Sequence, residues 1–133
     1  MALTKEERAR FLHNANAVLD KASKEFNATL ATQIADLVRA IETGDLDETL
    51  TQSYHIKATA GGFGWPLLSS AAGLLHLLAD RPAGEPVHWI LLHQFIVPLK
   101  ALTQEKFKGE HQDGVAMIKE LYAKLEANDM LAR

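Results

Sequence analysis

Apolar residues recur along this chain at intervals of three and four positions, the period of an α-helix with one buried face. Thr4 and Glu7 form a capping box that predicts the start of a first helix. Its expected buried face consists of Phe11, Leu12, Ala15, Val18, Leu19 and Ala22. A second stretch with the same period carries Leu30, Ile34, Leu37, Val38 and Ile41. Gly44 is placed to end that stretch, because glycine adopts the left-handed conformation after a helix at little cost.

The rest of the chain follows the same period. Asp45 is a good N-cap for a third helix with its apolar side at Leu46, Leu50, Ile56, Ala60 and Phe63. Pro66 suits the first position of a fourth helix. A loop is expected over residues 80–86, followed by a helix over 87–108 that Pro98 should kink or end. A last amphipathic helix carries Val115, Ile118, Leu121, Tyr122 and Leu125.

This pattern predicts an all-α protein, because no stretch alternates apolar and polar residues between hairpin turns as strands do. Short connections rich in Gly and Pro favour antiparallel neighbours. We therefore expect an antiparallel four-helix bundle with an additional N-terminal helix. The length of 133 residues fits a single domain over residues 1–133.

Composition narrows the functional classes. The chain has no cysteine, which excludes disulfides, thiolate nucleophiles and zinc sites built on cysteine. The net charge of −3, with Lys and Arg dispersed, gives no basic stripe for nucleic acid. No apolar run or signal-peptide core predicts a membrane span or export, so we expect a cytoplasmic protein. The histidines lack metal-ligand spacing, so we expect no metal site and no cofactor; those weighed are His13, His76, His88, His93 and His111.

The most informative segment runs from Ser53 to Leu67, with the sequence SYHIKATAGGFGWPL. It resembles the signature of histidine-containing phosphotransfer (HPt) domains. In that family an exposed helical His is followed by a hydrophobic residue, Lys and a small residue, then by a Gly-rich turn with Phe-Gly. The Trp-Pro-Leu that follows here is similar to the alphaproteobacterial form. The resemblance implies a four-helix bundle that acts in two-component phosphorelays.

One position departs from the family. The phosphoacceptor His of HPt domains lies three residues before the Lys, and the corresponding residue here is Tyr54, with His55 one position later. The resemblance thus implies an HPt-like protein without its phosphoacceptor. A phenol is almost wholly protonated at pH 7, and its phosphate ester is too stable to be relayed, whereas a neutral imidazole is a competent nucleophile.

Helix geometry separates these two residues. Tyr54, Lys57, Ala58 and Gly61 are spaced i, i+3, i+4 and i+7, so they share one face, while Ile56 and Ala60 are directed inward. The resemblance implies that this face docks on a receiver domain. His55 is turned by ~100° from Tyr54 and lies on a different line of the helix.

Three functions remain open. The first is a non-catalytic module that binds a response-regulator receiver domain, which can be part of a hybrid histidine kinase. The second is an active phosphotransfer protein that uses the displaced His55 as its phosphoacceptor. The third is a structural or dimerisation bundle outside signalling. None of them is an enzyme in the ordinary sense.

Overall fold

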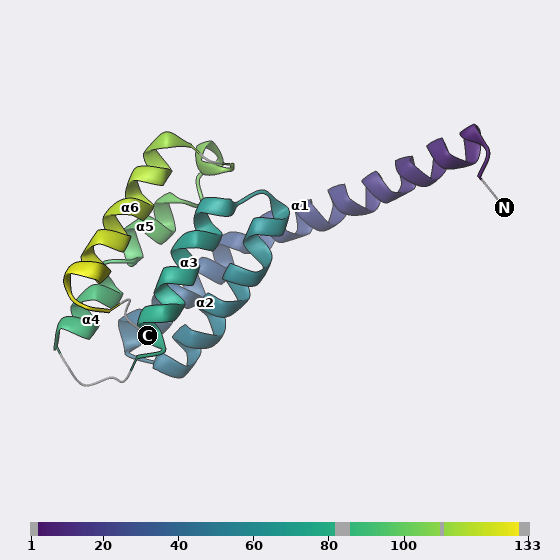
Figure 1. The fold of residues 1–133 in the computed structure, drawn as a ribbon. Coiled ribbons are helices and arrows are strands. Elements are labelled where there is room, and N and C mark those ends of the chain that lie inside the picture. Colours follow the sequence, from purple (N-terminus) through teal and green to yellow (C-terminus); the bar gives the residue numbers. More distant parts are fainter. Residues whose placement is uncertain (1–2, 82–85, 110, 131–133) are drawn as a thin grey trace. The chain divides into compact units, whose positions relative to one another are not determined.

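The computed structural model of the protein describes residues 3–81, 86–109 and 111–130 (Figure 1). Within these ranges the chain is all-helical and contains no strand, as the apolar period predicts. Its internal contacts divide it into two compact units, one ending at Leu30 and one beginning at Ala31. No helix among the described residues is long and apolar enough to cross a membrane.

The first helix, α1, spans Lys5–Thr43, so the two apolar stretches predicted separately form one continuous helix. The capping box at its start is confirmed: the Thr4 hydroxyl accepts from the Glu7 amide at 3.0 Å, and the Glu7 carboxylate accepts from the Thr4 amide at 3.4 Å. At its end Gly44 adopts φ +75°, the left-handed conformation expected there.

The predicted burial of the first apolar face is wrong. Ala15 and Ala22 are half-buried. The four large side chains are more than half exposed, at 65% for Phe11, 55% for Leu12, 68% for Val18 and 63% for Leu19. Helical periodicity identifies which face of a helix is apolar, but it does not say whether the same chain supplies a surface to cover it.

Two helices of the second unit, α2 (Leu46–Ala60) and α3 (Pro66–Ala79), lie side by side (Figure 1). The short 3₁₀ helix η1 (Gly61–Phe63) and Gly64, at φ +90°, join them. The Asp45 carboxylate accepts from the Glu48 amide at 3.0 Å and caps α2 as predicted. Pro66 is the first residue of α3, where its missing N–H costs nothing.

The helix predicted over residues 87–108, which Pro98 should kink or end, is not continuous. The chain forms α4 (Pro86–His93), α5 (Ile96–Ala101) and the 3₁₀ helix η2 (Glu105–Phe107) instead. Pro98 has no amide hydrogen to donate to the carbonyl four residues earlier, so the break falls at Gln94 and Phe95, one turn before the proline. Most of the predicted loop over 80–86 lies outside the described residues.

The last helix, α6, spans Gln112–Ala127 and packs against α3. Large side chains from every α-helix of the second unit are almost completely buried, with 2% or less of their surface exposed. They include Leu37, Ile41, Ile56, Leu68, Leu75, Leu78, Leu92, Phe95, Leu99, Leu102, Phe107 and Leu125. This core fixes the orientation of α2 and α3 and thereby determines which of their residues face solvent.

Candidate functional site

The buried side of α2 determines what its other side presents. Thr49, Ser53, Ile56 and Ala60 are buried at intervals of four, three and four residues, which is one helix face. As the sequence predicts, Ile56 and Ala60 point inward and are fully buried. The opposite face is therefore solvent-facing.

The structure places the four predicted partner-contact residues on that solvent-facing side. Tyr54 is 59% exposed, and Lys57, Ala58 and Gly61 are exposed as well. We call this set, together with the residues of α3 that contact it, the α2–α3 face. Its exposure is confirmed; its role in partner binding stays a prediction.

Small residues of α3 shape the floor of the α2–α3 face. A Cβ atom added to Gly73 would lie 3.6 Å from Cδ and 3.8 Å from Cε of Lys57, so the aliphatic part of this lysine runs across α3 at the glycine. The Ser69 hydroxyl donates to the Lys57 carbonyl at 2.8 Å, and a Cβ on Gly61 would lie 3.6 Å from the Ser69 oxygen. The backbones of α2 and α3 approach closely here because Gly61, Ser69 and Gly73 have little or no side chain.

His76 contributes an imidazole to this face that sequence analysis did not assign to it. The rings of Tyr54 and His76 lie 5.7 Å apart between centroids, at an interplanar angle of 53°. Nδ1 of His76 is 3.3 Å from the Leu50 carbonyl oxygen and 3.5 Å from the Ser53 hydroxyl, which itself donates to that carbonyl at 3.1 Å.

These contacts favour one tautomer of His76. A backbone carbonyl oxygen only accepts hydrogen bonds, so a hydrogen bond between Nδ1 and the Leu50 carbonyl requires the tautomer with its hydrogen on Nδ1. In the neutral ring Nε2 then keeps its lone pair, which makes it an acceptor and a potential nucleophile.

The sequence signal that places His76 on the α2–α3 face is its spacing from Ser69 and Gly73, four and three residues apart along one side of α3. Using that signal requires knowing that α3 packs beside α2.

His55 is exposed, and the structure does not bring it into the group formed by Tyr54, Lys57 and His76. Its backbone carbonyl accepts from the Thr59 hydroxyl at 2.8 Å, on a different line of α2. Its displacement from Tyr54 by one helix position is the ~100° turn expected from helix geometry.

The turn after α2 is held from both sides. The Trp65 amide donates to the Ala60 carbonyl at 2.9 Å, and the Gly64 amide donates to the Gly61 carbonyl at 3.3 Å, which closes the end of the helix. The Gly64 carbonyl in turn accepts from the Gly109 amide at 2.9 Å, which ties the turn to the segment before α6. This fixed backbone positions Gly61 at the edge of the α2–α3 face.

Among the described residues no group of three or more His, Cys, Asp or Glu side chains could hold a metal ion. His88 is buried in α4, and its Nε2 lies 2.8 Å from the Leu78 carbonyl oxygen. It is therefore a residue of the core and not of the exposed α2–α3 face. Tyr54, His76 and Lys57 supply a phenol, an imidazole and an ammonium group to the α2–α3 face.

Comparison with known proteins gives no match: neither a family model, nor a curated protein, nor a solved structure is significantly similar to this chain.

Proposed function

We propose that this protein is an HPt-like module that binds a response-regulator receiver domain through the α2–α3 face. In this proposal the second unit is an antiparallel four-helix bundle, the protein acts in the cytoplasm, and phosphate is not relayed through Tyr54. The support is the resemblance of the segment from Ser53 to Leu67 to the HPt signature, together with the geometry of the side chains in it.

The observation that carries the proposal is the position of Lys57. Its aliphatic stem crosses α3 at Gly73, and its backbone carbonyl accepts a hydrogen bond from Ser69. The stem and backbone of the lysine are therefore held in place while its ammonium group lies on an exposed surface. Receiver domains are phosphorylated on an aspartate, and a lysine beside small residues suits an approaching acidic pocket. Ala58, Gly61 and Gly73 leave room for a partner backbone to come close.

Tyr54 argues against transfer at the same place. Its ring is exposed beside His76, but a neutral phenol is a poor nucleophile, and the phosphate ester it would form is too stable to be passed on. Binding tolerates this replacement better than transfer does. Affinity is spread over many contacts, whereas transfer needs the reacting atoms ~3–3.5 Å apart and in line.

The proposal is tested by measuring binding to the receiver domains encoded in the same genome, each with and without phosphorylation. We expect at least one to bind the unmodified chain. Ala58→Arg, which places a bulky side chain on the α2–α3 face, should weaken that complex by about tenfold or more, the loss typical of a central contact. Lys57→Glu should weaken it similarly by reversing the charge.

The matched control is Lys119→Glu, which makes the same charge change at an exposed position of α6. This variant should bind as the unmodified chain does. Absence of binding to every receiver would refute the proposal, as would equal weakening by Lys57→Glu and Lys119→Glu. Transfer of phosphate from a receiver to the unmodified chain would instead support an active phosphotransfer protein.

A further inference from the structure

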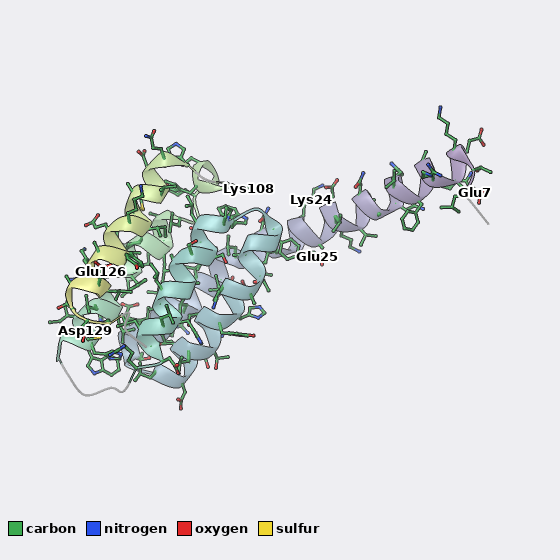
Figure 2. All side chains as sticks on the ribbon, viewed as in Figure 1. Glu7, Lys24, Glu25, Lys108, Glu126 and Asp129 are labelled. Carbon is green, nitrogen blue, oxygen red and sulfur yellow. The ribbon has the colours of Figure 1, made fainter. Side chains whose placement is uncertain are left out.

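The unit that ends at Leu30 carries an apolar face that nothing in the described residues of that unit covers. Phe11, Leu12, Val18 and Leu19 are all more than half exposed, and Ala15 lies between the two pairs. Figure 2 shows the side chains along this helical unit, with Glu7 near its start and Lys24 and Glu25 near its end. Soluble proteins seldom leave several neighbouring large apolar side chains in water unless a partner covers them.

A partner would also stabilise the helix itself. Isolated helices are marginal in water, and most helical stability in proteins comes from packing of an amphipathic face. Asn14, Asn16 and Asn27 are weak helix formers that make this segment less stable alone. A surface that packs against the apolar face would supply the missing stabilisation.

We infer that this face pairs with the same face of a second copy of the chain, in an antiparallel arrangement centred on Ala15. Each residue turns the helix by ~100°, so the four large side chains lie at similar angles around the helix axis from Ala15. Phe11 and Val18 lie on one side of it, and Leu12 and Leu19 lie on the other. A two-fold axis through Ala15 therefore places Leu12 against Leu19 of the partner subunit. It also places Phe11 against Val18 of the partner subunit, with the two Ala15 methyl groups meeting at the centre.

We call the line of contact between the two helices the seam. The residues at its ends favour the antiparallel direction. Arg8 and Ala22 lie within ~20° of the line through Ala15, so both are on the seam. A parallel pair would bring two Arg8 guanidinium groups together. The antiparallel pair places Arg8 opposite the partner's Ala22, with Glu25 of the partner subunit near enough to receive the guanidinium.

The size of the seam indicates how strong the association is. Residues 8–22 extend over about 22 Å of helix. A contact between two helices of this length is smaller than the ~800 Å² per partner of a standard stable interface. The dimer should accordingly be weak and reversible, with a mass that rises with concentration from that of one chain to that of two.

Sedimentation of the full chain over a wide range of concentration tests the association. Leu12→Glu/Leu19→Glu should abolish it, because four carboxylates would face one another across the seam. The matched control is His13→Glu/Ala17→Glu, which adds the same residues to the opposite, exposed side of the helix and should still dimerise. A chain that is monomeric at all concentrations overturns the inference, as does equal loss in both double variants.

Cysteine cross-linking tests whether the two helices run antiparallel. The chain has no native cysteine, so only the introduced cysteines can form disulfides. Under mild oxidation Ala15→Cys should form a disulfide-linked dimer. Arg8→Cys alone should not, since antiparallel pairing separates the two cysteines by about 21 Å, beyond disulfide reach. A mixture of Arg8→Cys and Ala22→Cys chains should cross-link. Cross-linking of Arg8→Cys chains with one another, and no mixed dimer between Arg8→Cys and Ala22→Cys chains, overturns the antiparallel arrangement.

Discussion

In the proposed HPt-like function, Tyr54 is the single residue with the most direct consequence, because the resemblance puts it in the place of the phosphoacceptor. Replacing it with histidine restores an imidazole beside Lys57 without disturbing the core, since the side chain is 59% exposed. We expect Tyr54→His to raise phosphoryl transfer from a phosphorylated receiver by about tenfold or more over the unmodified chain. The measurement is transfer of label to the protein, with the base-stable, acid-labile behaviour of phosphohistidine.

His55→Ala and His76→Ala in the Tyr54→His background are the controls for that experiment. Neither should remove the gained transfer, because His55 lies on another line of α2 and His76 is held by Leu50 and Ser53. If the unmodified chain already accepts phosphate, the same two substitutions identify the nucleophile. Loss of that activity in His55→Ala would support the displaced histidine as phosphoacceptor.

The exposure of Tyr54 and Lys57 could be predicted from sequence, and the place of His76 could not. The first follows from helical spacing within α2, a local property of fifteen residues. The second depends on the pairing of α2 with α3, which brings residues 22 positions apart into ring contact. Local periodicity carries no information about which residue of one helix lies opposite which residue of the next.

At the scale of helices, Gly114 of α6 marks a tight contact. A Cβ there would overlap a methyl group of Leu67 and approach a ring carbon of Phe107 to 2.9 Å and a methyl of Leu102 to 3.3 Å. All three neighbours are buried, so they have little freedom to yield. Gly114→Ala should lower the free energy of unfolding by about 1 kcal/mol, because overpacking of ~1–3 kcal/mol exceeds the ~1 kcal/mol gain in helix propensity. Urea denaturation measures the change.

Gly73→Ala is the natural comparison for Gly114→Ala, because both glycines lie within helices. Its Cβ would make only ordinary contact, at 3.6 Å, with the stem of Lys57. The helix-propensity gain should then dominate, and unfolding should become harder by about 0.5–1 kcal/mol. Destabilisation by Gly73→Ala would contradict the ordinary contact with Lys57, and a stabilising Gly114→Ala would show that α6 is not tightly packed at that glycine.

Asp45 offers a second test among the helices. Its carboxylate accepts from the Glu48 amide, a bond that the spacing of the two residues predicts and the structure confirms. Asp45→Ala should cost about 1 kcal/mol of unfolding free energy, the usual loss for an N-cap, measured by thermal or urea denaturation. Asp47→Ala, in the first turn of α2 but not at the cap, should cost clearly less. An equal loss in the two variants would mean that helix-dipole charge, rather than the cap, accounts for the effect.

The helix boundaries show the same division between local and non-local causes. Caps and glycines were predictable, because each is decided by a few consecutive residues such as Asp45 and Glu48. The division of residues 87–108 into α4 and α5 was predicted one turn too late, because the effect of Pro98 falls on the carbonyl of Gln94 rather than on the proline itself.

For the whole molecule, the helical fold could be predicted from the sequence, but the predicted burial of the first apolar face is wrong. Phe11, Leu12, Val18 and Leu19 follow the same helical period as the buried apolar residues from Leu30 to Ile41, and both sets include large apolar side chains. Whether an apolar face is covered within one chain depends on the remainder of the fold. In the proposed dimer, the same face of a second copy covers it.

The division into two units predicts how the protein responds to shortening. Removing residues 1–22 deletes the mostly exposed side chains of Phe11, Leu12, Val18 and Leu19, so little of their apolar surface is lost from burial in dilute, monomeric protein. The free energy of unfolding in urea should change by no more than about 1 kcal/mol, the range of exposed substitutions. At high concentration the full chain should gain stability that the shortened chain lacks, because association stabilises only the species that can dimerise. A shortened chain that is strongly destabilised when dilute would show that these residues support the fold within one chain.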